Sequence, residues 1–439
     1  MKPAAKRIVH DYGMVLVLLA LCAFFSVLTY REQPTTGAAA GAQLAQQIRS
    51  EFEGTPRVMI VVRDQPDDVA LEERLKRDLE AAGANVVAVA RGEPRDAREV
   101  LRTLAAGGEK LEVIAGTQTT GAWLVFADLK TDFPMLGEPR IATPRSYKWP
   151  NFLKADNLLN IANQIAVIAI IAIGMTLVII TGGIDLSVGS LIALSAVLAT
   201  KMIRDSFGGL EASASAMVVS CLAAIVLCGL VGAFSAAMIT QFDVPPFIVT
   251  LAMMFICSGS AYRISHEQSI YQIPDSFVWL GRGADLFGLP NSVVLMLVLY
   301  GAAHVLMSRM RLGRYLYAVG GNREAARLSG VPVKRVVMFA YTASAMLAAL
   351  GGVVMASNLK SGSPTYGDSY ELYVIAAVVV GGASLSGGEG RMFGTLTGAF
   401  TIAVIQNGMN LMNIESRTQQ IVLGAVILGA VVIDKLQRR

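Results

Sequence analysis

Residues 165–200 read IAVIAIIAIGMTLVIITGGIDLSVGSLIALSAVLAT, an apolar run interrupted by a glycine pair and one carboxylate. About twenty apolar residues in a helix cross the roughly 30 Å hydrocarbon core of a bilayer, so this stretch is long enough for nearly two spans. Asp185 lies between them, and a carboxylate so placed usually faces a bundle interior, a polar cavity or the interface. Two interpretations are open: Asp185 is the N-cap of the second span, or it takes part in transport. Both place the stretch in a membrane.

The composition of the whole chain indicates a protein that crosses the membrane many times. Of its 439 residues, 54% are apolar and only 16% are charged, whereas globular chains carry roughly 25% charged residues. Residues 31–150 contain 16 Lys and Arg and 18 Asp and Glu, against 18 and 14 in the longer remainder from residue 151. This distribution predicts one soluble segment joined to a largely lipid-embedded one.

We therefore divide the chain into three parts: an N-terminal transmembrane helix in 1–31, a small α/β domain in 32–149 and a helical membrane core in 150–439. The first part has a short basic start and an apolar run over 8–28. That run is long enough for an uncleaved span, the alternative being a secretory signal. Basic residues before the span predict a cytoplasmic N-terminus and an extracytoplasmic 32–149.

Within 32–149, segments rich in β-branched residues alternate with segments of helical periodicity. This alternation is typical of a βαβ unit with a small parallel or mixed sheet. The expected elements are a flexible linker at 33–41, strands at 56–64 and 85–92, helices at 69–84 and 94–108, and two further candidate strands at 111–117 and 122–129.

Nine spans are predicted after residue 150, which with the first helix makes an all-α polytopic core of about ten. Residues 150–164 before them are amphipathic and are expected to lie at the membrane interface, in contact with lipid. The loop 309–335 holds seven Lys and Arg, and the chain ends on basic residues. The positive-inside pattern therefore places this loop and the C-terminus in the cytoplasm. The nine spans are expected at about 165–182, 186–203, 216–240, 245–265, 291–309, 334–357, 371–386, 392–410 and 418–434.

Several classes of function lack their motifs in this sequence. There is no G-x-x-x-x-G-K-[ST] phosphate loop, no H-E-x-x-H and no nucleophile elbow, so we expect no enzyme, metal site or cofactor. The four cysteines lie in apolar runs without metal-ligand spacing. His304 lies inside a span, where a packed side chain is commoner than a proton relay. Because the spans carry almost no acids for ion coupling, the energy for transport should come from a partner.

The cytoplasmic segment 311–335, RLGRYLYAVGGNREAARLSGVPVKR, indicates where that partner binds. Asn322 is a suitable N-cap for one short amphipathic helix that Gly330 and Pro332 end. Such a helix fits a cleft on another protein, and an ordinary connecting helix is the alternative. The candidate contact residues are Asn322, Glu324, Ala325, Ala326, Arg327, Leu328, Ser329 and Gly330.

A weak internal repeat is present. VIITGGIDLSVGSLIAL (178–194) resembles VVVGGASLSGGEGRMFGTL (378–396) in a glycine pair followed by leucine, serine and glycine. Glycine-interrupted segments at corresponding positions of two halves point to a transport pathway at their junction. The alternative is chance, because small-residue turns are common in membrane helices.

Four motifs together resemble the permease subunits of bacterial ribose-, xylose- and galactose-type ABC importers. The resemblance covers the chain from about 150 to 434, with the motifs in the expected order, and extends to the first helix. The motifs are GMTLVIITGGIDLSVGS (174–190), DVPPFIVTLAMMF (243–255), RLGRYLYAVGGNREAARLSGV (311–331) and IAAVVVGGASLSGGEG with GTLTGAF (375–400).

The resemblance implies a monosaccharide importer in the inner membrane. Two permeases, identical or sister chains, would dock on a cytoplasmic ATPase and receive the sugar from an extracytoplasmic binding protein. It also implies that the E-A-A-x-x-x-G pattern from Glu324 to Gly330 contacts the ATPase. Which sugar is carried is left open, and no nucleic-acid partner is expected. Candidate pathway residues are Asn160, Asn163, Gln164, Gly182, Gly183, Asp185 and Ser187.

The domain at 32–149 departs from this family, whose members pass almost directly from the first helix to the segment that is Asn151-Phe152-Leu153 here. Its strand and helix order is loosely similar to one lobe of a periplasmic sugar-binding protein, and about 120 residues suffice for one lobe only. A docking or regulatory role is expected first and a sugar-sensing half-site second. For the whole chain, the alternative is a membrane-anchored sensor or receptor that uses this domain.

Overall fold

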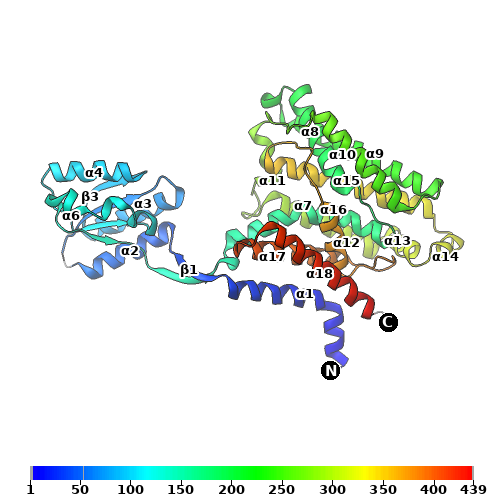
Figure 1. The fold of residues 1–439 in the computed structure, drawn as a ribbon, viewed down its shortest axis with the longest axis horizontal. Helices are drawn as coiled ribbons and strands as arrows, with labels where there is room; N and C mark the ends of the chain where they lie inside the picture. Colours follow the sequence, from blue (N-terminus) through cyan, green and yellow to red (C-terminus); the bar gives the residue numbers. More distant parts are fainter. Residues whose placement is uncertain (1–2, 53, 438–439) are drawn as a thin grey trace. The chain divides into compact units, whose positions relative to one another are not determined.

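The computed structural model describes residues 3–52 and 54–437, which form two compact units (Figure 1). One unit combines the residues up to Thr29 with those from Asn151 onward, and the other runs from Tyr30 to Pro150. We call them the helical unit and the inserted unit.

The inserted unit is a three-layer α/β fold around a parallel sheet with strand order β3-β2-β4-β5. Successive side chains of a strand point to opposite faces, so Val58, Ile60 and Val62 pack against α2 and α3, while Met59 and Val61 pack on the side of α4. The elements are α2 (Gly37–Glu51), β2 (Arg57–Val62), α3 (Pro66–Ala81), β3 (Asn85–Arg91), α4 (Pro94–Ala106), β4 (Val113–Gly116), α5 (Gln118–Gly121), α6 (Leu129–Asp132) and β5 (Arg140–Ala142).

Two expectations for the inserted unit are wrong. Residues 33–41 are not a flexible linker, because β1 (Tyr30–Pro34) pairs with β6 (Ser146–Pro150) in an antiparallel ribbon and α2 begins at Gly37. Residues 122–129 are not a strand but a 3₁₀ turn, Leu124–Phe126, and the start of α6. Phe126 and Leu129, three residues apart, both bury their side chains in the core that contains α4, which is the spacing of a helical turn. The other predicted strands and helices of this unit are confirmed.

In the described part of the helical unit there are eight long helices and several short ones. The long helices are α1 (Pro3–Leu28), α7 (Ala155–Ile180), α9 (Ala214–Gln241), α10 (Pro246–Ser265), α12 (Asn291–Arg309), α15 (Val333–Leu359), α17 (Met392–Leu411) and α18 (Ser416–Gln437). The shorter ones include α8 (Val188–Lys201), α11 (Trp279–Arg282), α13 (Arg311–Gly321), α14 (Arg323–Leu328) and α16 (Tyr370–Val380).

Five of the described helices, α7, α9, α10, α12 and α15, are long and apolar enough to cross a membrane. The span predicted at 186–203 is matched by α8, which continues directly into a π-helical turn, Met202–Ser206. Where a full span was predicted at 371–386, α16 has only 11 residues, which at 1.5 Å per residue extend about 16 Å, short of the roughly 30 Å hydrocarbon core. The protein is a multi-pass membrane protein, and the total of about ten spans stays a prediction.

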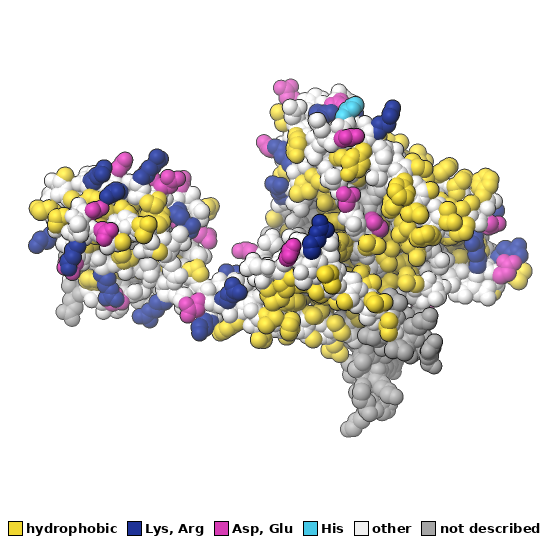
Figure 2. Space-filling view, in the orientation of Figure 1, with side chains coloured by type: hydrophobic (Ala, Val, Ile, Leu, Met, Phe, Trp, Pro, Cys, Tyr) yellow, Lys and Arg dark blue, Asp and Glu magenta, His cyan; other side chains and the backbone are white. Residues whose placement is uncertain are grey.

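The centre of the helical unit is formed by α7 and α15. In the most apolar 18 residues of α7, 89% are buried, against 28% in α10. Small residues allow close crossings, because Gly174 lies against Ser344 of α15, and Gly352 of α15 lies against Ser195 of α8. The outer helices expose large apolar side chains such as Leu230 on α9, as a lipid-facing surface requires (Figure 2).

Residues 150–164 do not form a separate interfacial segment, since α7 begins at Ala155 and continues without a break to Ile180. The turn before it, Asn151–Leu153, is fixed to the end of α1. The Phe152 N–H donates to the Thr29 hydroxyl at 3.1 Å, the Asn151 N–H donates to the Thr29 carbonyl at 3.0 Å, and the Phe25 and Phe152 rings stack. The two helices from which the inserted unit leaves are thus held together at its base.

Candidate coupling and translocation site

The helix predicted to meet a partner is present as α14, with the expected ends. The Asn322 side chain accepts a hydrogen bond from the Ala325 N–H at 2.9 Å, which confirms the predicted N-cap. Gly330 adopts φ +82°, a conformation that favours glycine, and the Val331 N–H closes the end on the Ala326 carbonyl at 3.0 Å. A second helix, α13, directly precedes Asn322 and was not predicted.

The surface of α14 divides into an anchored face and an exposed one. Ala326 is buried against the helical unit, whereas the Leu328 side chain is 80% exposed. Glu324 and Arg327 form an exposed ion pair, and the Arg327 guanidinium holds the pKa of the Glu324 carboxyl below its usual range. The exposed face of α14 therefore presents an apolar side chain beside a charge pair.

Gly320, at the end of α13, contacts two glycine-rich turns of the helical unit. The first turn follows α7 and the second follows α16, and the Gly388 N–H donates to the Ile180 carbonyl at 2.9 Å. A Cβ built on Gly320 would overlap that same carbonyl oxygen and the Gly388 nitrogen, so only glycine fits there. The Tyr317 hydroxyl of α13 also donates to the Gly390 carbonyl at 2.6 Å. The segment that carries α14 therefore contacts both turns directly.

The two turns have the same backbone structure. Gly182 and Gly382 adopt φ +80° and +88°. The next residue in each case donates its N–H to the helix, Gly183 to Val178 and Ala383 to Val378, at 3.1 Å in both turns. In this comparison Gly182 corresponds to Gly382, one residue away from the register that aligns the two glycine pairs, so the internal repeat of 178–194 and 378–396 stays a prediction.

Asp185 lies in the first turn and is almost fully buried, with 2% of its surface exposed. One carboxylate oxygen accepts from the Ser187 N–H at 3.0 Å and from the Ser187 hydroxyl at 2.6 Å, and the other accepts from the Ser344 hydroxyl at 2.9 Å. The interpretation of Asp185 as the N-cap is wrong, because α8 begins at Val188 with Ser187 in the cap position. Asp185 instead closes a turn before the helix and ties it to α15.

Tyr341, one turn before Ser344 on α15, belongs to the same cluster. Its ring is 1% exposed, and among the described residues its hydroxyl has no hydrogen-bond partner. The hydroxyl lies against Gly183, where a Cβ would overlap it. Neither Tyr341 nor Ser344 was predicted, since an apolar helix with scattered serines and tyrosines gives no signal in the sequence. Gly320 could have been suspected from the Gly320-Gly321 pair.

The remaining pathway candidates lie at the opposite end of α7 and do not join this cluster. Asn160 and Gln164 are exposed on one side of α7, and Asn163 accepts a hydrogen bond from the Ser292 hydroxyl of α12. At 1.5 Å per residue, Asn160 lies about 33 Å along the chain from Gly182. The seven candidates thus form two groups, one near each end of α7.

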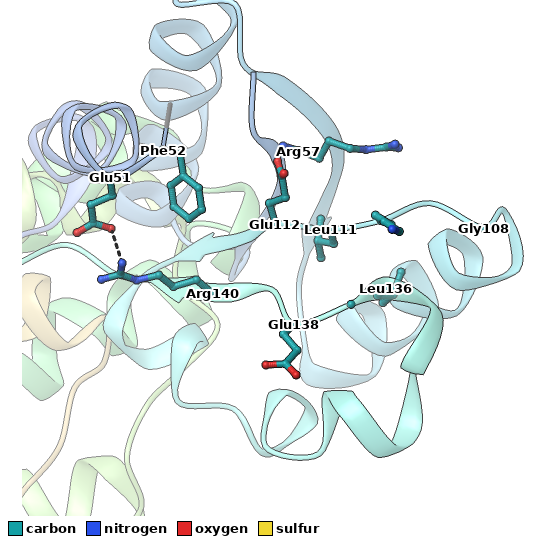
Figure 3. Close-up of a pocket in the computed structure, with 11 residues that line it drawn as sticks. Glu51, Phe52, Arg57, Gly108, Leu111, Glu112, Leu136, Glu138 and Arg140 are labelled. Atoms are coloured by element: carbon teal, nitrogen blue, oxygen red, sulfur yellow. Dashed lines mark hydrogen bonds and ion pairs between the residues drawn. The ribbon is translucent and has the colours of Figure 1, made fainter. Parts of the chain in front are cut away.

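The inserted unit carries a groove of about 820 Å³ at the edge of its sheet where the strands begin (Figure 3). Arg140 pairs with Glu51 at 3.2 Å inside it, and Phe52 supplies an aromatic ring. Open α/β sheets bind small ligands at the opposite edge, outside the carboxyl ends of the strands. The groove therefore does not lie where open α/β sheets bind small ligands. Its charged lining residues are Glu51, Arg57, Lys110, Glu112, Glu138 and Arg140.

Residues 157–431 match the family model described as the branched-chain amino acid transport system / permease component. The chain belongs to this family, so it is the membrane subunit of an ABC-type transport system and not an enzyme. This confirms the family inferred from the four sequence motifs, and it does not favour a sensor or receptor. A permease of this kind works with an ATPase subunit and a binding protein. The match begins after the inserted unit.

Individual relatives are permeases whose printed names specify sugars. The chain is 42% identical over 289 residues to the ribose import permease protein of Escherichia coli (strain K12), covering 65% of this chain and 87% of that protein. It is 41% identical over 288 residues to the ribose import permease protein of Bacillus subtilis (strain 168), with 65% and 87% covered. It is 34% identical over 285 residues to the D-allose transport system permease protein of Escherichia coli (strain K12), with 65% and 85% covered. No solved structure matches the chain.

Proposed function

We propose that this chain imports a monosaccharide of the ribose or allose type across the inner membrane. The proposal is supported by the sugars named for its relatives. The observation that carries the mechanism is the contact of Gly320 with both glycine turns, because it links the coupling segment to the centre of the helical unit. Two copies, or this chain and a sister permease, enclose the pathway.

The proposed orientation places both termini and α14 in the cytoplasm and the inserted unit on the extracytoplasmic side. It is supported by the cations around α14, Arg323, Arg327, Lys334 and Arg335 among them. In this orientation α14 faces the ATPase and the inserted unit faces the binding protein. Labelling of a Leu328→Cys variant on intact cells by a membrane-impermeant reagent, beyond the level of the unmodified chain, would contradict it.

In the proposed mechanism the ATPase moves α14 and the helical unit transmits that movement along two routes. One route runs through α13 and Gly320 to the two glycine turns. The other runs through α15, which begins at Val333 shortly after α14 and reaches Asp185 through the Ser344 hydroxyl at 2.9 Å. Alternating access then follows if the turns and their helices shift between two packed arrangements. The residues that move in this mechanism are those of the first glycine turn, Gly182, Gly183, Asp185 and Ser187. The pathway has its other entrance near the start of α7, where Asn160, Asn163 and Gln164 lie.

Reversing the charge of Glu324 tests the proposed contact with the ATPase. We expect Glu324→Lys to lower ATP hydrolysis stimulated by sugar-loaded binding protein about tenfold or more, as when one partner of an interfacial charge pair is lost. The measurement uses the assembled complex in proteoliposomes. Glu415→Lys is the matched control, because Glu415 is exposed in the loop before α18 and should leave the rate unchanged. Full stimulation of the Glu324→Lys complex would contradict the docking role of α14.

For the inserted unit we propose docking of the binding protein through the groove of mixed charge. The β1–β6 ribbon offers a clean deletion, because Pro34 pairs with Ser146 at its outer end. Replacing residues 35–145 with Asn-Gly closes the ribbon by a two-residue hairpin turn. We expect the closed-ribbon chain to fold, since its core lies in the helical unit, and to need about tenfold more binding protein for half-maximal stimulation, equivalent to about 1.4 kcal/mol.

Two other results of this deletion would reject docking. An unchanged requirement for binding protein would show that the inserted unit makes no energetically important contact with it. An unchanged requirement combined with an altered range of imported sugars would favour the sugar-sensing half-site.

A further inference from the structure

The β1–β6 ribbon joins the helical unit through its two innermost residue pairs. Tyr30 pairs with Pro150 and Arg31 with Trp149, and the neighbouring residues Thr29 and Asn151 already belong to the helical unit. An isolated two-stranded ribbon is marginally stable in water. Contact of its side chains with another environment would therefore add to its stability.

The side chains at this end are unusual for a ribbon exposed to water. Tyr30 and Trp149 are 54% and 45% exposed. Arg31 is also exposed, and it shares a ribbon face with Trp149, because residues directly opposite in an antiparallel pair point to the same side. Glu32 and Lys148 are opposite each other in the register and balance in charge, which leaves Arg31 as the excess cation.

With α1 as the predicted first span, the distance along the chain puts these residues at the membrane surface. The apolar helix α1 ends at Leu28, two residues before Tyr30. A strand rises about 3.4 Å per residue, so the first two ribbon pairs lie within about 7 Å of Thr29. The hydrocarbon core is roughly 30 Å thick and the whole bilayer about 40–45 Å. The interfacial layer on each side is therefore about 5 to 7 Å thick. Tyr and Trp are enriched in that layer, and anionic headgroups attract Arg and Lys.

We propose that the innermost end of the β1–β6 ribbon is a lipid-binding anchor seated in the phospholipid headgroup layer. The Tyr30 and Trp149 rings lie at the boundary between headgroups and acyl chains, and Arg31 binds lipid phosphate. Lipid is the occupant in preference to a soluble protein, because Tyr30 follows the apolar helix α1 by only two residues. This inference rests on α1 as a membrane span and holds whatever the solute or the role of the inserted unit.

Tryptophan fluorescence tests the anchor, because the full chain has three tryptophans, Trp123, Trp149 and Trp279. The variant W123F/W279F retains Trp149 alone, and the matched control W149F/W279F retains Trp123, which stacks on Phe126 within the inserted unit. Both are reconstituted at full length in nanodiscs that contain phospholipid with a nitroxide either near the headgroup or deep in the acyl chain. Elution as a single species checks that each variant is folded.

We expect the shallow nitroxide to remove most of the Trp149 emission, the deep one to remove less, and neither to affect Trp123 to the same extent. Quenching of Trp149 no greater than that of Trp123 would overturn the anchor. Stronger quenching by the deep nitroxide would also overturn it, because it would place Trp149 in the hydrocarbon core. Quenching by the shallow nitroxide that disappears when the binding protein is added would assign the surface to that protein instead.

Discussion

Replacing Gly320 with alanine is expected to abolish sugar uptake, whereas the same change at the next residue, Gly321→Ala, should leave uptake nearly unchanged. A Cβ on Gly320 would overlap the Ile180 carbonyl oxygen and the Gly388 backbone, while a Cβ on Gly321 meets nothing within 4 Å. Because the obstructing atoms are backbone, rotation of a side chain cannot relieve the overlap. Overpacking of this kind costs about 1–3 kcal/mol, and here it separates the coupling segment from both glycine turns.

Gly321→Ala is a close control for Gly320→Ala, because the two glycines are adjacent in the same helix. Both residues lie in the last turn of α13, and alanine is the better helix former by about 1 kcal/mol, so the intrinsic effect favours both variants equally. The difference between them therefore reports the contact with the turns. Uptake by proteoliposomes and thermal unfolding in detergent are measured on both variants. Equal uptake by Gly320→Ala and Gly321→Ala would show that the contact does not transmit coupling.

Much of the local structure can be predicted from the sequence, because its determinants are local. Asn322 and Gly330 are capping residues at the correct spacing, and they do cap α14. The alternation of β-branched runs with helical periodicity likewise predicts β2, α3, β3 and α4. The prediction of a strand at 122–129 failed, because the apolar residues there have the spacing of short helical turns buried beside α4 and not the alternation of a strand.

The candidate site was only half predictable, because its contacts join residues far apart in the sequence. Asp185 stands out as a charge in an apolar run, but its partner Ser344 is 159 residues away and is one of many serines. Gly320 and Gly388 meet only through the packing of the helices. The length of α16 was overestimated for a related reason, since hydropathy does not distinguish a helical residue from an apolar residue in the following turn.

Removing the Asp185 carboxylate is the second change for which we expect a large effect. In Asp185→Ala, the Ser187 N–H and the Ser187 and Ser344 hydroxyls lose their acceptor in a site that is almost fully buried. An unsatisfied buried polar group costs about 1–3 kcal/mol, so we expect a loss of several kcal/mol in stability and loss of uptake. Asp156→Ala, an exposed carboxylate in the first turn of α7, is the control and should change either property little.

The asparagine variant separates the hydrogen bonds of Asp185 from its charge. Asn has nearly the same shape, its Oδ1 can accept from the Ser187 N–H, and its amide can donate to the Ser344 hydroxyl. If Asp185 acts by tying the first glycine turn to α15, Asp185→Asn should keep most of the thermal stability and most of the uptake that Asp185→Ala loses. A stable Asp185→Asn chain without uptake would show instead that the negative charge itself acts during translocation. In that case the Ser344 hydroxyl would have to release Asp185 in another state, and the Tyr341 hydroxyl, one turn earlier on α15 and without a hydrogen-bond partner among the described residues, is a donor on the same helix able to receive it.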